Sequence, residues 1–154
     1  MGAVDPAVAG TALPELTVEV ERGRLRSFAA AIGETDPVYS DPDVARAAGH
    51  ADLPVPPTLL FGLGLGRGAE DFAWLVDLGV DVRHVLHGEQ SFSYHAVAHA
   101  GDTLTLAPTI VDVFSKRGGA LQFLIRETAV CHADGRPVAD LRDTIVVRDP
   151  GATA

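Results

Sequence analysis

The alternation of apolar and polar residues divides the chain into a helical first half and a strand-rich second half. Residues 16–20 alternate as in a strand, and residues 24–32 then place apolar side chains at helical spacing. Gly33 follows this helix as a typical C-cap. A shorter helix is predicted over residues 43–48, and it also ends at a glycine, Gly49.

The second half contains four stretches that alternate at least in part and predict strands: residues 88–96, 103–114, 120–132 and 137–148. They are separated by glycine-containing turns at residues 101–102, 117–119 and 133–135. Because the last two turns are typical of hairpins, we expect an antiparallel meander.

Two adjacent prolines, Pro56 and Pro57, open a run that is apolar on every side. Because proline is tolerated only in the first turn of a helix, we expect a helix to begin at about Pro57 or Thr58. A helix that is apolar all round is enclosed by other structure. The chain therefore predicts an α+β fold in which a long, curled antiparallel sheet wraps around one central apolar helix.

The 154 residues suit a single domain, with a core at about residues 15–148 and loose ends at residues 1–11 and 150–154. A net charge of −9 without any cluster of lysine and arginine argues against a nucleic-acid partner. The single cysteine, Cys131, excludes an intrachain disulfide and favours a reducing cytoplasm. No apolar run is long enough to span a bilayer, so we expect a soluble, cytoplasmic protein without a membrane partner.

Five ordered segments resemble the MaoC-like dehydratase family, and more closely its N-terminal-type, fungal fatty-acid-synthase-like domain. These segments are IGETDPVYSD at 32–41, ARAAG at 45–49, PVPPT at 54–58, LHGEQSF at 86–92 and AGDTL at 100–104. The resemblance implies a hot-dog fold and a dimer whose interface carries a tunnel for an acyl thioester. It also implies reversible hydration of trans-2-enoyl-CoA or enoyl-ACP to the 3-hydroxyacyl thioester, without a cofactor.

Catalytic members of that family carry the motif Asp-x-Asn-Pro-x-His, and this chain departs from it. Aligning the motif at Pro37 puts Glu34 at the Asp position, Asp36 at the Asn position and Tyr39 at the His position. General acid/base catalysis needs a group that changes protonation near neutral pH, whereas tyrosine titrates at about pH 10. As residues alone, Glu34 and Asp36 cap a turn and Tyr39 fills a wall.

Three functions remain open from this departure. In the first, the chain is the acyl-binding half of a hydratase or dehydratase whose Asp and His come from a MaoC-like catalytic subunit. In the second, the chain forms a self-sufficient homodimer with a modified acid/base set, drawn from Glu34, Tyr39, His87 and Glu89. Alternatively, it is a non-enzymatic acyl-CoA-binding protein.

We expect the acyl thioester to bind mainly along the apolar run that follows Pro56 and Pro57, and at the start of that run. Pro56 and Pro57 have no N–H, so Thr58 and Leu59 provide the first candidate amides for the thioester carbonyl. The full set of expected binding residues is Asp36, Pro57, Thr58, Leu59, Phe61, Gly62 and Trp74.

His87 and Glu89 allow two interpretations, a substitute acid/base pair or a hydrogen-bonded strand entry. The structural interpretation is the simpler one. The other histidines are scattered without metal-ligand spacing, so no metal site is predicted. The glycines from Gly62 to Gly66 lack the spacing and the lysine of a nucleotide-binding loop.

Overall fold

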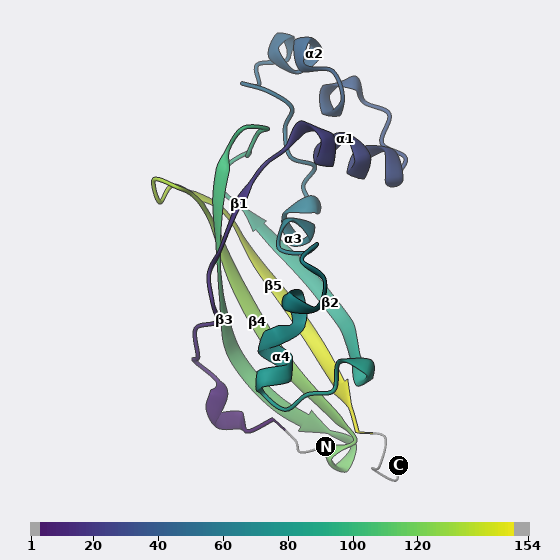
Figure 1. Ribbon diagram of the computed structural model, residues 1–154, viewed down its shortest axis with the longest axis vertical. Coiled ribbons are helices and arrows are strands. Elements are labelled where there is room, and N and C mark those ends of the chain that lie inside the picture. The colour runs from purple at the N-terminus through teal and green to yellow at the C-terminus, as the bar shows by residue number, and fades with distance from the viewer. Residues whose placement is uncertain (1–3, 150–154) are drawn as a thin grey trace.

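The computed structural model describes residues 4–149 and contains one five-stranded antiparallel sheet (Figure 1). Its strands lie in the order β1-β3-β4-β5-β2, so β1 and β2 are the two edges. The strands are β1 (Leu16–Glu19), β2 (Val85–Tyr94), β3 (Thr103–Lys116), β4 (Leu121–His132) and β5 (Pro137–Arg148). The sheet curls, and α3 (Leu59–Leu63) and α4 (Ala73–Asp77) lie against its concave face (Figure 1). This is the predicted α+β hot-dog arrangement.

Strand β2 begins at Val85, three residues before the start that the alternation predicted. Gly88 hid this start, because a glycine within a strand pattern suggests a break. It lies instead at a bulge, where the register with β5 shifts between His87 and Glu89. A Cβ on Gly88 would lie 3.1 Å from Val146 Cγ2, so the close approach of β5 explains the glycine.

The central helix α3 begins at Leu59 with Thr58 as its N-cap, in agreement with the proline-based prediction. Leu59, Leu60 and Leu63 are buried, so the helix is enclosed as expected. It spans only five residues, which is shorter than the apolar run. The guanidinium of Arg24 lies at the C-terminal end of α3 and donates hydrogen bonds to backbone carbonyls there. One of these bonds joins Arg24 Nη2 to Leu65 O at 2.8 Å.

Helices α1 (Arg22–Ala31) and α2 (Pro42–Ala47) lie together at one end of the sheet (Figure 1). They are followed by Gly33 and Gly49, whose φ angles of 74° and 95° confirm the predicted helix ends. The 3-10 helices are η1 (Pro6–Val8), η2 (Pro37–Tyr39), η3 (Gly68–Phe72), η4 (Val82–His84) and η5 (Arg117–Gly119). None of the helices within residues 4–149 combines the length and hydropathy of a bilayer-spanning segment.

The hydrophobic core is divided into two clusters along the length of the sheet. One cluster surrounds α3 and includes Leu63, Leu104 and Val130. The other surrounds α4 and includes Leu75 and Leu124. The division matters because the space between the two clusters is where the cavity described below lies.

The N-terminal segment packs on the sheet, so the expectation that residues 1–11 are loose was wrong for its described part. Val4 is buried, and its backbone N–H and C=O both bond the Gln122 side chain at 2.7 Å. Gly10 N donates to Ile110 O, and Ala12 forms a β-bridge with Thr109. The other ends expected to be loose, residues 1–3 and 150–154, lie outside the described residues.

A histidine cluster joins the α1–α2 end of the molecule to the sheet. His50 Nδ1 lies 3.1 Å from His99 Nε2, and Asp102 accepts a hydrogen bond from the His99 amide at 2.8 Å. His132 Nδ1 lies 3.7 Å from the Asp102 carboxylate. Burial lowers the pKa of His99, with His50 and His132 acting in the same direction and Asp102 and Asp52 opposing them.

We expect the free energy of unfolding to decrease as the pH falls from about 7 to about 5. The unfolded chain binds a proton on His99 near its ordinary pKa, whereas the folded chain resists that proton, so acid favours unfolding. Urea unfolding across this range should show a shallower pH dependence for His99→Gln. The control is His95→Gln, which removes an exposed histidine bonded to Asp140 and should not flatten the profile. Identical slopes for the wild type and His99→Gln would contradict the assignment.

Candidate functional site

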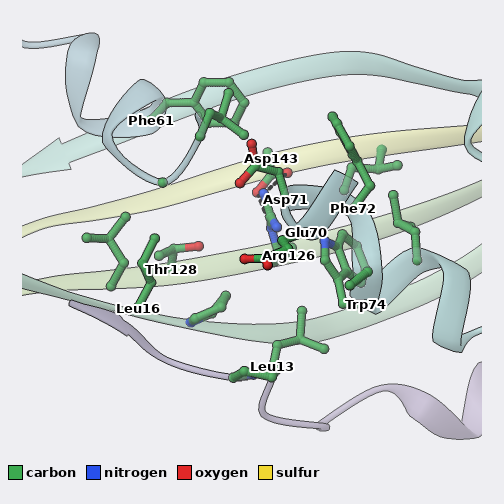
Figure 2. A pocket seen from close by; sticks show the side chains of 18 of the residues that line it. Leu13, Leu16, Phe61, Glu70, Asp71, Phe72, Trp74, Arg126, Thr128 and Asp143 are labelled. Carbon is green, nitrogen blue, oxygen red and sulfur yellow. Dashed lines mark hydrogen bonds and ion pairs between the residues drawn. The ribbon is translucent and has the colours of Figure 1, made fainter. Parts of the chain in front are cut away.

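A cavity of about 730 Å³ lies between the concave face of the sheet and the segment that carries α3 and α4 (Figure 2). Its volume is within the range of about 300–1,000 Å³ that is typical of small-molecule sites. Most of its wall is apolar, with contributions from Leu13, Leu16, Leu60, Phe61, Phe72, Trp74, Leu106 and Leu141. A cavity of this volume and lining suits a ligand with a largely hydrocarbon body.

Three of the residues singled out in the sequence line this cavity: Phe61, Trp74 and His87. The rings of Phe61 and His87 stack with centroids 5.0 Å apart and planes within 11°. Phe61 comes from α3 and His87 from the edge strand β2, so the fold brings together two predicted residues that are distant in sequence. His87 is exposed, and this places a titratable imidazole at the solvent-facing side of the cavity wall.

Glu89 does not share that position. The bulge in β2 sets His87 opposite Ile145 and Glu89 opposite Thr144 on β5. Of the two, only His87 lines the cavity among the described residues. Both residues lie within β2, close to its start.

Glu34, Asp36 and Tyr39 lie in and beside the η2 turn, at the α1–α2 end of the molecule. Glu34 Oε1 accepts a hydrogen bond from the Asp36 amide at 2.9 Å, and Asp36 Oδ1 accepts one from the Val38 amide at 3.0 Å. Both carboxylates therefore satisfy backbone donors of the turn. Within residues 4–149, none of the three side chains is part of the cavity lining.

The start of α3 is also outside the lining. The Leu59 amide donates to Pro56 O at 2.9 Å, so it is not a free donor for a carbonyl. Thr58 is exposed, and its side chain makes no capping hydrogen bond. Pro57 and Gly62 likewise do not line the described cavity. The cavity reaches α3 through Leu60 and Phe61, of which Phe61 was predicted and Leu60 was not.

An ion pair that was not predicted from the sequence lies on the floor of the cavity, between Arg126 of β4 and Asp143 of β5 (Figure 2). The pair is bidentate, with Nε–Oδ1 and Nη2–Oδ2 distances of 3.1 Å. Asp143 is only 2% exposed, which is rare for a carboxylate. Thr128, the next inward residue along β4, is also buried and lines the cavity.

The Trp74 indole covers the guanidinium of this pair from the opposite side of the cavity. The Arg126 Cζ lies 5.1 Å from the centroid of the Trp74 ring, within the range of a cation–π contact. Trp74 was predicted as a binding residue for the acyl thioester, and its contact with a cation gives it a second role. It packs against the guanidinium and also forms part of the cavity wall.

Asp71 orders the loop between α3 and α4. Its carboxylate accepts hydrogen bonds from the Gly66 amide at 2.7 Å and from the Arg67 amide at 3.2 Å. These backbone donors, led by Gly66, lower the pKa of Asp71 and keep it ionised. Because Asp71 and its neighbour Glu70 both line the cavity, this wall carries negative charge (Figure 2).

Alternation along β4 and β5 could have revealed the missed residues. Leu124 and Val130 face the core, so the same phase directs Arg126 and Thr128 inward. On β5 the buried Leu141 and Ile145 likewise set Asp143 inward. A charged residue at an inward position of each neighbouring strand is the signal that was available in the sequence.

Known proteins are similar to this chain over nearly its whole length. Residues 7–141 match the family described as FAS1-like, dehydratase domain region. A UPF0336 protein of Clavibacter michiganensis subsp. michiganensis is 38% identical over 150 residues, covering 97% of this chain and 99% of that protein. A UPF0336 protein of Streptomyces griseus subsp. griseus is 42% identical over 117 residues, covering 75% of this chain and 77% of that protein.

Solved structures share the fold at lower identity. A HadBC (3R-hydroxyacyl-ACP dehydratase) complex from Mycobacterium tuberculosis has a TM-score of 0.74 at 23% identity, covering 90% of this chain and 96% of that one. The ChsH1–ChsH2 complex from the same organism has a TM-score of 0.73 at 20% identity, covering 96% and 94%. A MaoC-like dehydratase reaches 0.77 at 20% identity, covering 94% of this chain and 43% of that one. These similarities confirm the hot-dog fold.

The buried ion pair has a direct energetic test. Arg126→Met should lower the free energy of unfolding by about 3 kcal/mol, because it leaves the Asp143 carboxylate buried without its partner. The double variant Arg126→Met/Asp143→Leu should regain most of that loss, since apolar residues of similar volume remove both buried charges. Denaturant unfolding measures both changes. An equal loss in the single and double variants would contradict this description of the pair.

Proposed function

Since this chain belongs to the family of FAS1-like dehydratase domains, we propose that it is the acyl-binding subunit of an acyl-thioester hydratase or dehydratase. The reaction is the reversible addition of water across the 2,3 double bond of a trans-2-enoyl thioester of CoA or ACP, which yields the 3-hydroxyacyl thioester. The observation that carries the proposal is the large, mostly apolar cavity, in a chain without the family's catalytic Asp and His.

The cavity accounts for the binding half of this function. Each methylene that moves from water into an apolar site contributes about 0.8 kcal/mol. The walls from α3, α4 and the concave face of the sheet supply that apolar surface around Leu60, Phe61 and Trp74. The acyl chain lies in the cavity, and the thioester and its carrier remain outside.

The catalytic half comes from a partner subunit. Hydration requires one group that removes a proton from water and another that returns a proton to the substrate carbon. Glu34 and Asp36 are engaged with turn amides, and Tyr39 replaces the imidazole of the motif. A MaoC-like partner that carries an intact Asp-x-Asn-Pro-x-His motif supplies both groups. The two-subunit HadBC and ChsH1–ChsH2 complexes, which share this fold, support such a partnership.

The edge strand β2 is the surface on which the partner docks. One side of β2 pairs with β5, and no described strand covers its other side. An open edge of ten residues exposes unpaired backbone donors and acceptors, which folded proteins normally cover. Leu86 and Tyr94 on β2 are 48% and 49% exposed, so docking there also buries apolar surface.

A self-sufficient homodimer is the second candidate, and His87 is the observation that favours it. His87 lines the cavity and is exposed beside it, where its imidazole has access to water and to a bound acyl thioester. In that version His87 acts as the acid/base group, and the same β2 edge pairs with a second copy. A non-enzymatic acyl-CoA-binding protein has the same cavity but gives no rate gain with any partner.

Hydration assays distinguish these functions. The purified chain should hydrate crotonyl-CoA and longer enoyl-CoAs slowly or not at all, and a MaoC-like subunit with the intact motif should raise the rate at least tenfold. Rapid turnover by the chain alone, abolished in His87→Ala, would support the homodimer instead. Calorimetric binding of acyl-CoA without any rate gain in the reconstituted complex would support only the binding protein.

Assembly through β2 is tested by a charge at its exposed apolar position. Leu86→Asp should weaken association by at least tenfold, because it places a carboxylate within the apolar part of the interface. Sedimentation velocity measures the change, for the chain alone and with its partner. Ile32→Asp alters a residue that is 56% exposed at the end of α1 and should leave association unchanged. Equal effects of the two substitutions would contradict docking on β2.

A further inference from the structure

The ion pair Arg126–Asp143 interrupts an otherwise continuous apolar floor. On β4 the inward residues run from Leu124 in the α4 cluster to Val130 in the α3 cluster, with Arg126 and Thr128 between them. On β5 Asp143 takes the same position between the two clusters. The polar residues therefore line the cavity between the two apolar clusters (Figure 2).

The guanidinium of Arg126 has donors to spare. Of its five N–H groups, one on Nε and one on Nη2 bond Asp143. No residue between 4 and 149 accepts a hydrogen bond from Nη1. Asp143 and Trp74 hold the guanidinium in place, so these spare donors are fixed in direction before any ligand arrives.

Such a pair is costly in a site that binds plain hydrocarbon. Burying two charges requires several kcal/mol of desolvation, and apolar replacements of similar volume are often at least as stable. A saturated chain that passes Arg126 removes water from its N–H groups and offers them nothing in return. Stability and binding of a plain chain would therefore both favour apolar residues at these positions.

We propose that the acyl chains accepted by this cavity carry an uncharged oxygen, a hydroxyl or keto group remote from the thioester, that accepts a hydrogen bond from Arg126. This inference rests on the proposed function and names its substrate class. Thr128, two residues along the same face, offers a hydroxyl as a second polar contact. The hydrocarbon on either side of the oxygen packs against the two apolar clusters.

The charges around the cavity favour an uncharged oxygen over a carboxylate. Five carboxylate residues line the wall, Glu15, Glu70, Asp71, Asp77 and Asp143, against the two guanidiniums of Arg67 and Arg126. Arg126 is already neutralised by Asp143, and Arg67 pairs with Asp71. An anionic tail would meet net negative charge, whereas a hydroxyl or keto oxygen needs only the spare N–H donors.

The test is calorimetric binding of a matched series by the full chain. The ligands are dodecanoyl-CoA and the positional isomers of hydroxydodecanoyl-CoA, each with one hydroxyl at a position from carbon 6 to carbon 12. We expect at least one isomer to bind about tenfold more tightly than dodecanoyl-CoA, the size of one hydrogen bond to a charged donor. Arg126→Met/Asp143→Leu should lose this preference and bind dodecanoyl-CoA as tightly as the wild type or more tightly.

A matched ion pair on the outer face of the same strands provides the control. Glu127 and Arg142 are paired across β4 and β5, and both are exposed. Glu127→Leu/Arg142→Met removes an equivalent cross-strand pair outside the cavity and should keep the preference for the hydroxylated chain.

The outcomes separate this inference from the proposed function. Wild-type protein that binds dodecanoyl-CoA as tightly as every hydroxylated isomer would overturn the substrate class and leave acyl binding intact. Retention of the preference in Arg126→Met/Asp143→Leu would overturn the role of the pair. Failure to bind any acyl-CoA of the series would overturn the proposed function itself.

Discussion

Packing of the leucines of α3 against the concave face of the sheet is the interaction on which the rest of the structure depends. Leu59, Leu60 and Leu63 are buried in one cluster with Leu104 and Val130 of the long strands. The helix is only five residues long, so it covers one part of the concave face and leaves the rest to α4. A curled sheet covered by two short helices, instead of one long helix, leaves space between them.

That space is the cavity, and its chemistry follows from its position between two apolar clusters. A void lined only by leucine and phenylalanine would favour any hydrocarbon of suitable size. Here the strand positions that face the gap carry Arg126, Thr128 and Asp143. The fold thus combines a large apolar wall with one oriented polar group, which is the usual design of a site that selects among similar ligands.

The proposed division of labour agrees with the hydrogen bonds of the η2 turn. Glu34 and Asp36, at the Asp and Asn positions of the family's motif, each hold a backbone amide, and Tyr39 stands at the His position. Carboxylates engaged in this way stabilise a turn and are poorly placed to remove a proton from water. In the proposed division the chain provides the scaffold and the cavity, and the open edge of β2 is where the catalytic subunit would dock.

Local sequence determined the elements, whereas tertiary packing decided the site. Alternation and glycine turns predicted the strands and hairpins, and the proline pair predicted the start of α3, because these signals act over a few residues of chain. The start of β2 was missed because Gly88 serves the close approach of β5, and the docking of Val4 depends on Gln122, 118 residues away. Phe61 and Trp74 were expected to contact an acyl chain, but the pairing of Arg126 with Asp143 requires the register of β4 and β5. No local pattern contains that register, because it is set when the whole sheet closes over the helices.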